Sequence, residues 1–231
     1  NQICEVSGAD LTVVPLSLEK PTADFTKDEA LSEIELCDAM EIGSQSVNLE
    51  ADIILLGEMG IGNSTISSAL ATSVFGGSVE SWVGAGTGSD QKGQAHKAAI
   101  IELGIKKHGS RKGLKALQAF GGREQAAICG AILAARSASI PVLLDGFICT
   151  AAAAPLFGES HSSLDHCLFG HLSTEPGHKF LLKAMGKSAI LNLNMRLGEG
   201  TGAALALSII RSAVACHNNM ATFKSAGVSS K

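Results

Sequence analysis

The residues best suited to chemistry begin with a glycine-rich stretch, residues 57–64 (GEMGIGNS), between an apolar run and a helix-forming segment. It differs from the nucleoside-triphosphate loop GxxxxGK[ST] because Asn63 replaces the lysine and Glu58 lies inside the loop. A loop without that lysine favours a single phosphate, held by backbone amides at the helix N-terminus, over ATP. The alternative is a tight turn that binds no ligand. The candidate binding residues of this stretch are Glu58, Gly60, Gly62 and Asn63.

A second glycine-rich stretch, residues 84–90 (GAGTGSD), precedes a predicted helix that carries Lys97. The stretch does not spell GxGxxG, and no acidic residue follows a strand about 20 residues later, so a dinucleotide site is disfavoured. On its residue type alone, Lys97 belongs on a solvated helix face.

A third stretch, residues 198–202 (GEGTG), places the carboxylate of Glu199 between two glycines. Because neither neighbour has a side chain, a flat ligand can approach this carboxylate closely. Apolar residues at alternate positions from Leu191 to Leu197 predict an apolar setting, which would make Glu199 a stronger base, while Arg196 opposes that effect. A carboxylate that only favours the helix dipole is the alternative. Gly198 is the second candidate residue of this stretch.

Two further candidates follow apolar runs. Asp145 comes directly after IPVLL and is followed by Gly146, where a parallel strand would deliver residues to its carboxyl end. Residues 173–178 (STEPGH) are typical of a helix start, with proline in the first turn. Ser173 can cap that helix or bind a phosphate oxygen there.

The elements that must position these residues alternate between short apolar strands, glycine turns and alanine-rich helices. Strands are predicted at residues 11–16, 51–56 and 140–144, and residues 81–83 lead into the second glycine stretch. Thr26 and Glu29 have the spacing of a capping box and predict a helix start. This alternation predicts an α/β fold, with a parallel sheet between helices and peripheral helices at both ends of the chain. We expect one domain over residues 1–231.

Composition excludes several function classes. The net charge of −4 and the 4% aromatic content argue against nucleic-acid binding. No apolar run has the length of a membrane span. The six scattered cysteines indicate reduced thiols in a cytoplasmic protein. The histidines and cysteine between His161 and His178 fit no zinc spacing, so capping and loop roles are favoured over a metal site.

Taken together, the motifs resemble the nicotinate-nucleotide–dimethylbenzimidazole phosphoribosyltransferase family of cobalamin synthesis. The resemblance runs through GEMGIGNST, VGAGTGSD, GGREQAAICGAILAAR, IPVLLDGF, HLSTEPGH, MRLGEGTGAALAL and MATF, in the family's order and over nearly the whole chain. It implies a Rossmann-like α/β homodimer with a small helical subdomain, without metal or cofactor. The implied reaction moves the 5-phosphoribosyl group from nicotinate mononucleotide to 5,6-dimethylbenzimidazole.

The same resemblance assigns roles to residues. Glu199 is the implied base, and Glu58 matches an acidic residue that positions ribose or acceptor. Leu197 matches a position that lines the acceptor pocket. Positions associated with the nucleotide and its phosphate match Gly60, Lys97, Gly146 and Ser173.

One family feature is missing from this sequence. Family members carry a longer N-terminal region with PGSLGRLE-like and DHGV-like segments, which supplies part of the benzimidazole pocket. We therefore expect either a fragment or a natural short variant with an incomplete acceptor site. A related transferase with another acceptor, and a nucleotide-binding form without turnover, remain alternatives. A P-loop kinase is disfavoured by Asn63.

Overall fold

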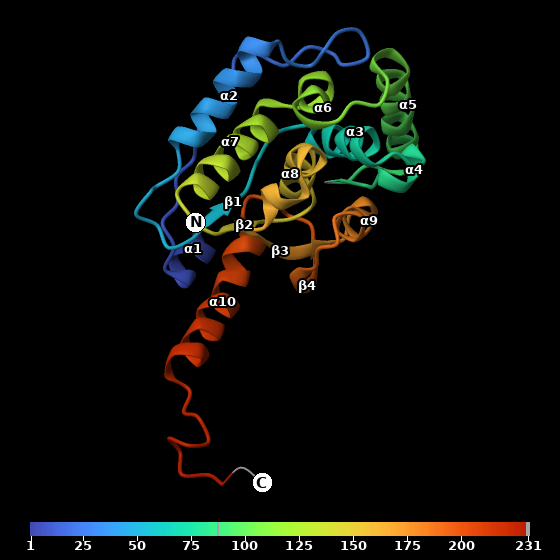
Figure 1. Ribbon diagram of the computed structural model, residues 1–231. Coiled ribbons are helices and arrows are strands. Elements are labelled where there is room, and N and C mark those ends of the chain that lie inside the picture. The colour runs from blue at the N-terminus through green and yellow to red at the C-terminus, as the bar shows by residue number, and fades with distance from the viewer. Residues whose placement is uncertain (87, 230–231) are drawn as a thin grey trace.

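The computed structural model describes residues 1–86 and 88–229 and is built around a four-stranded sheet in the order β1-β2-β3-β4 (Figure 1). Each neighbouring pair of strands is parallel. The strands are β1 (Ile54–Leu56), β2 (Val142–Leu144), β3 (Cys167–Ser173) and β4 (Ala189–Met195). The predicted α/β fold with a parallel sheet between helices is confirmed.

The helices are α1 (Gln2–Ser7), α2 (Glu33–Gln45), α3 (Asn63–Phe75), α4 (Val79–Trp82), α5 (Gln91–His108), α6 (Gly113–Phe120), α7 (Arg123–Ser137), α8 (Phe147–Glu159), α9 (Pro176–Ala184) and α10 (Thr201–Asn219), with a 3₁₀ turn at His161–Leu164. None of those in the described ranges combines the length and the apolarity needed to cross a membrane.

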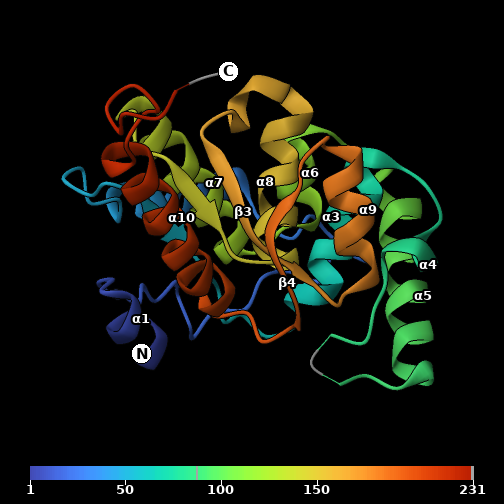
Figure 2. The same cartoon turned by 90° about the horizontal axis from the view of Figure 1, so that it is seen from below.

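The order of the strands determines which face each helix covers. Right-handed crossovers between parallel strands that follow one another across a sheet place every connecting helix on the same face. Helices α3, α7, α8 and α9 accordingly lie on one side of the sheet, and α10, which follows the last strand, packs on the other side with α1 (Figures 1 and 2). Strand β2 is covered by hydrophobic core on both faces. Val142 and Leu144 belong to the larger of two clusters of buried apolar residues, and Leu143 belongs to the smaller cluster, which lies against α10.

Glycine and alanine, rather than aromatic residues, allow the helices to pack closely. A Cβ on Gly43 of α2 would lie 1.9 Å from the carbonyl oxygen of Ala127, and one on Gly130 of α7 would lie 1.9 Å from that of Met40. The two helix backbones therefore contact each other directly, and any larger side chain at either glycine would push them apart.

The predicted strand at residues 11–16 is wrong. The segment forms no strand, and Leu11, Val13 and Val14 are exposed. Pro15 cannot donate to a strand ladder, and an isolated apolar run without a partner strand has no reason to be extended in a sheet.

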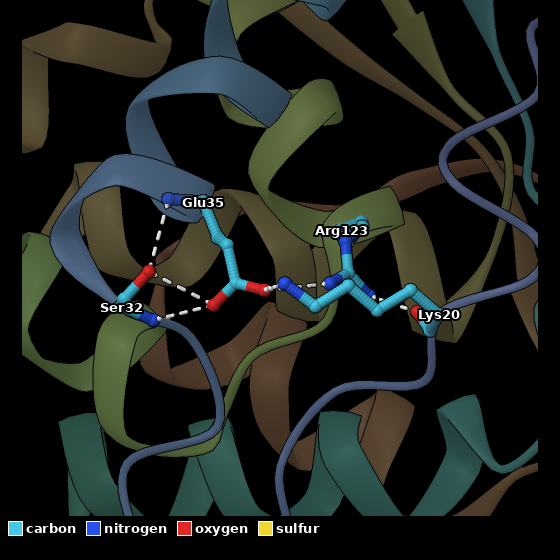
Figure 3. A network of polar contacts seen from close by, with 4 residues as sticks. All are labelled: Lys20, Ser32, Glu35 and Arg123. Atoms are coloured by element: carbon cyan, nitrogen blue, oxygen red, sulfur yellow. Dashed lines mark hydrogen bonds and ion pairs between the residues drawn. The ribbon is translucent and has the colours of Figure 1, made fainter.

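The predicted helix start at Thr26 is also wrong. There Asp24 accepts hydrogen bonds from the backbone and hydroxyl of Thr26, which stabilises a turn. Helix α2 begins after Ser32, whose hydroxyl accepts from the backbone N–H of Glu35 while the Glu35 carboxylate accepts from the backbone N–H of Ser32. Both segments have capping-box spacing, but only the second places its glutamate beside Lys20 and Arg123 (Figure 3).

The second glycine stretch follows a short helix rather than a strand, because α4 occupies Val79–Trp82. The ring N–H of Trp82 donates to the carbonyl of Gly76, and the hydroxyl of Ser68 on α3 donates to the carbonyl of Trp82. These bonds fix the segment against α3, so the second stretch still reaches the carboxyl edge of the sheet. Thr87 of this stretch lies outside the described residues.

Candidate active site

A cavity of about 270 Å³ opens where the strands end. Every residue predicted to bind substrate lines it except Lys97, namely Glu58, Gly60, Gly62, Asn63, Asp145, Gly146, Ser173, Leu197 and Gly198. The cavity therefore unites four glycine-rich or strand-end segments that lie up to 140 residues apart in the sequence, from Glu58 to Gly198. This is the edge at which parallel α/β sheets bind their ligands.

The first glycine loop presents the N-terminus of α3 to the cavity. Gly62, the N-cap residue, has φ of 85°, a left-handed conformation that glycine adopts without steric cost. The Glu58 carboxylate accepts hydrogen bonds from the backbone N–H of Gly60 at 3.0 Å and from the side-chain amide of Asn63. A Cβ on Gly60 would lie 2.2 Å from the Asn63 amide nitrogen and from an oxygen of Glu124, so a larger residue here would displace these two side chains.

Burial raises the pKa of the Glu58 carboxyl above its usual range. The hydrogen bonds from Asn63 and Gly60 offset part of that effect, and the negative charges of Glu124 and Asp145 add to it. Glu58 is thus a carboxyl that holds a proton more readily than a free one, in contact with the cavity.

Lys97 joins the first two glycine loops. Its ammonium group, on α5, donates to the Ser64 hydroxyl at 3.1 Å and to the Gly84 carbonyl at 3.5 Å. Ser64 lies in the first turn of α3 and lines the cavity. The lysine therefore places a positive charge beside a helix N-terminus, where the two features attract an anion together.

The Gly198-Glu199-Gly200 turn presents Glu199 beside the cavity. All three residues have positive φ angles, 82°, 62° and 77°, and the backbone N–H of Glu199 donates to the carbonyl of Glu58 at 3.2 Å. The predicted apolar setting is wrong, because Glu199 is exposed and Leu193 and Leu197 are 56% and 63% exposed. Strand β4 is the last in the sheet, and side chains at an edge strand have no neighbour beyond them.

Asp145 lies at the end of β2, as predicted, and its carboxylate contacts the start of α10. One carboxylate oxygen accepts from the Ala203 N–H at 2.9 Å and the other from the Gly200 N–H at 3.2 Å. The ring of His171 lies beside it, with Nδ1 3.4 Å from the carboxylate. A Cβ on Gly146 would lie 2.6 Å from that ring, and one on Gly202 would lie 1.9 Å from it, so both glycines make room for His171.

His178 holds the Ser173 end of β3 in place. Its Nδ1 accepts from the backbone N–H of Ser173 at 2.9 Å, so Nε2 carries the proton and donates to the Thr150 hydroxyl at 3.0 Å. Burial, aided by the nearby His171, lowers the pKa of His178 to about 3 and keeps the ring neutral. The predicted helix start at Pro176 is confirmed, but the Ser173 hydroxyl accepts from the backbone N–H of Glu175 and does not cap the helix.

The remaining histidines of this region have separate contacts. His161 stacks on Phe157 with ring centroids 4.2 Å apart, and the ring of His166 bonds the Ile132 carbonyl. Within the part of the chain that the structure describes, no three His, Cys, Asp or Glu side chains gather in a way that could hold a metal ion.

Among the lining residues that were not predicted from the sequence, Glu175, His171 and Arg196 are the ones that can carry charge in the neutral pH range. Glu175 is 8% exposed, and one of its oxygens accepts from the Gly86 N–H at 2.8 Å. Its other oxygen has no hydrogen-bond partner among the described residues. The signal available was position, since Glu175 and His171 stand at the end of an apolar strand as Asp145 does.

Comparison with known sequences identifies the family. A sequence model of the family described as Phosphoribosyltransferase matches residues 1–228. The nicotinate-nucleotide–dimethylbenzimidazole phosphoribosyltransferase of Rhodobacter capsulatus is 53% identical over 228 residues, which cover 99% of this chain and 68% of that relative. The enzyme of the same name from Ruegeria pomeroyi is 50% identical over 229 residues, with the same two coverages.

Two solved structures support the same family assignment. The crystal structure of CobT from Thermus thermophilus matches with a TM-score of 0.89 at 32% identity, over 100% of this chain and 75% of that one. A nicotinate-nucleotide–dimethylbenzimidazole phosphoribosyltransferase from the same organism matches with a TM-score of 0.86 at 30% identity, over 100% and 74%. In sequence and in fold, the chain therefore belongs to the nicotinate-nucleotide–dimethylbenzimidazole phosphoribosyltransferase family.

Proposed function

We propose that this phosphoribosyltransferase transfers the 5-phosphoribosyl group of nicotinate mononucleotide to 5,6-dimethylbenzimidazole, with Glu199 as the base. Besides family membership, one observation carries the proposal. The N-terminus of α3 and Gly198 line one cavity, and Gly198 directly precedes Glu199, whose carboxylate stands between two glycines. A pentosyl transfer that releases a proton needs both, one to hold the donor and one to accept the proton.

The proposed transfer needs one proton acceptor and no proton donor. When the bond between C1′ of the ribose and the pyridinium nitrogen breaks, its electron pair neutralises the ring, so nicotinate leaves without an acid. The lone pair of one benzimidazole nitrogen forms the new bond to C1′, and the proton on the other ring nitrogen passes to the Glu199 carboxylate. Attack opposite the leaving group inverts C1′ and gives α-ribazole 5′-phosphate and nicotinate.

The phosphate of the donor belongs at the α3 end of the cavity. The backbone N–H groups of Asn63 and Ser64 at the start of α3 and the ammonium of Lys97, 3.1 Å from the Ser64 hydroxyl, offer donors and positive charge there. Ser173, at the end of β3, adds a hydroxyl at the cavity wall. These groups support a monophosphate, as expected from a loop in which Asn63 replaces the P-loop lysine.

The carboxylate of nicotinate belongs beside Arg196. Three acidic residues, Glu58, Asp145 and Glu175, line the cavity and disfavour a further carboxylate, whereas Arg196, which also lines it, carries a positive charge. An Arg196→Gln variant should bind nicotinate mononucleotide about 10-fold more weakly and lose its preference over nicotinamide mononucleotide. Competition between the two nucleotides measures this preference, and an unchanged ratio would exclude Arg196 from donor recognition.

The proposal is tested by following nicotinate release from nicotinate mononucleotide with and without dimethylbenzimidazole. Release that depends on the acceptor supports the transfer, and its absence at all acceptor concentrations contradicts it. Glu199→Gln should lower kcat by roughly 100- to 10,000-fold, because it removes the proton acceptor. The matched control is Glu102→Gln, an exposed glutamate on α5 outside the cavity lining, which should leave kcat unchanged.

We also propose that residues 1–231 form one domain that acts as a cytoplasmic homodimer. Apolar side chains exposed on α10 and beyond it, Ile209, Val214 and Phe223, support a further contact surface. The six cysteines are free, as in a reducing compartment. Sedimentation equilibrium tests the dimer, limited proteolysis tests the single domain, and cell fractionation tests the location.

A further inference from the structure

Asp145 stands between the sheet and the turn that carries the proposed base. It is 2% exposed, directly after β2, and both of its carboxylate oxygens are engaged by backbone N–H groups from the start of α10. These two donors, Gly200 and Ala203, belong to the first residues of a helix, whose N–H groups have no partner within the helix. One buried carboxylate thus satisfies two otherwise unpaired donors 55 and 58 residues away in sequence.

The turn held in this way has a backbone that needs support. Gly198, Glu199 and Gly200 are three consecutive residues in the left-handed region, and Glu199 has a steric cost there that its glycine neighbours avoid. Among the described residues, two backbone donors anchor the turn on the cavity side, Glu199 to the Glu58 carbonyl and Gly200 to Asp145. If the second is lost, the turn can relax and the Glu199 carboxylate moves.

Both oxygens of the Asp145 carboxylate are engaged by backbone donors of the α10 start. Its two oxygens already accept from Gly200 and Ala203, and the ring of His171 covers it at 3.4 Å. This arrangement argues against the substrate-binding role expected from its place at the strand end. It also explains why a buried carboxylate is retained without a lysine or arginine partner among the described residues, since the helix N-terminus supplies the positive potential.

We propose that Asp145 is a positioning residue, which fixes the N-terminus of α10 to the end of β2 and thereby holds Glu199 at the edge of the cavity. The inference rests on the proposed function in that Glu199 is taken as the base. It predicts that Asp145 acts on turnover only through Glu199. A residue that bound substrate directly, or that stabilised the fold alone, would not show this dependence.

A double-mutant cycle tests that dependence. In the wild-type background, Asp145→Asn should lower kcat about 100-fold with KM for nicotinate mononucleotide changed less than about 3-fold, because a displaced base affects the chemical step. In the Glu199→Gln background the same substitution should lower the residual rate by less than about 3-fold. Equal losses in both backgrounds, or a loss confined to KM, would overturn the proposal.

The control is Asp24→Asn. Asp24 also accepts a backbone N–H, that of Thr26 at 3.0 Å, but it lies outside the cavity lining. Thermal unfolding of both variants separates loss of the fold from loss of position. Asp24→Asn should leave kcat unchanged, and a comparable loss of kcat in this variant would mean that the assay reports stability alone.

A second measurement needs no variant and no activity. Amide hydrogen exchange in the wild-type chain should be slower at Gly200 and Ala203 than at Gly202, for which the described residues offer no acceptor. Equal exchange at the three amides would overturn the proposal even if Asp145→Asn fails to fold. If the wild type showed no nicotinate release while these amides were protected, the proposed function would fail and the anchoring role of Asp145 would stand.

Discussion

Two glutamates, Glu35 and Glu58, have carboxyl groups with opposite surroundings and opposite pKa shifts. Glu35, in the first turn of α2, pairs with Lys20 and Arg123 at 2.9 Å each and accepts from Ser32 (Figure 3). These contacts, led by Lys20, lower its pKa to about 2. Glu58, at the cavity, has hydrogen bonds from Asn63 and Gly60 but no cation partner among the described residues, and burial raises its pKa.

The difference separates a carboxylate that stabilises the fold from one that we propose to act on the substrates. A paired carboxylate such as Glu35 has little capacity left to bind or to exchange a proton. The cavity instead gathers Glu58, Asp145 and Glu175 without an ion pair to lysine or arginine in the described ranges of the chain. Burial of several carboxyl groups without a cation partner is unfavourable for stability and is typical of functional sites.

The largest difference between the two glutamates should appear in activity when each is replaced by glutamine. Glu58→Gln should lower kcat/KM roughly 100-fold, because the cavity loses an ionisable group beside the Glu199 turn. Glu35→Gln should change kcat/KM less than about 2-fold, because its contacts lie outside the cavity. Steady-state kinetics of nicotinate release measures both. A loss of similar size in the two variants would contradict a direct role of Glu58 in the reaction.

The two lysines of these regions, Lys97 and Lys20, should also differ in their effect on substrate binding. Lys97→Met should raise KM for nicotinate mononucleotide about 10-fold, with a smaller effect on kcat, because a phosphate contact is made equally in ground and transition states. Lys20→Met, which removes the cation paired with Glu35, is the matched control and should leave KM unchanged. An unchanged KM in Lys97→Met would remove Lys97 from the phosphate site.

The sequence predicted the cavity well where local rules decide the structure. Glycine turns after apolar runs placed Glu58 and Gly146 at strand ends, because parallel strands all deliver their carboxyl ends to one edge. The family resemblance, rather than spacing, predicted a phosphate-binding role for Lys97. Its approach to Ser64 joins residues 33 positions apart through the packing of α5 on α3, which no local pattern encodes.

What the sequence failed to predict depends on partners distant in the chain. Glu175 bonds Gly86 across 89 residues, so its burial could not be read from the helix start that surrounds it. The exposure of Leu193 follows from β4 being the last strand in the sheet, a property of topology. The start of α2 was misplaced because two segments have capping-box spacing and only Glu35 meets Arg123, 88 residues away.

The two substitutions should affect stability in the reverse order, with the larger loss in Glu35→Gln. Glu35→Gln should lower the free energy of unfolding by about 1 kcal/mol, because a partly exposed pair with Lys20 and Arg123 is weakened by solvent. Glu58→Gln should cause no loss at pH 7, since it keeps an acceptor for Gly60 and removes a buried charge. Urea unfolding measures both values. A Glu58→Gln variant less stable than Glu35→Gln would reverse the assignment of the two glutamates.

The smallest effects should appear in the pH dependence of stability, where the two glutamates have opposite signs. Glu35 has a folded pKa of about 2 against an unfolded value of 4.5, so its contribution is complete above pH 4.5 and is lost as the pH falls toward 2. Glu58 has a raised folded pKa, so its contribution is present below 4.5 and is lost as the pH rises through the folded value. Relative to wild type, Glu35→Gln should therefore be least stable near neutral pH, and Glu58→Gln least stable in acid. Urea unfolding of the three proteins from about pH 2 to about pH 8 measures the two differences, and slopes of the same sign would show that the pocket carboxyl is paired after all.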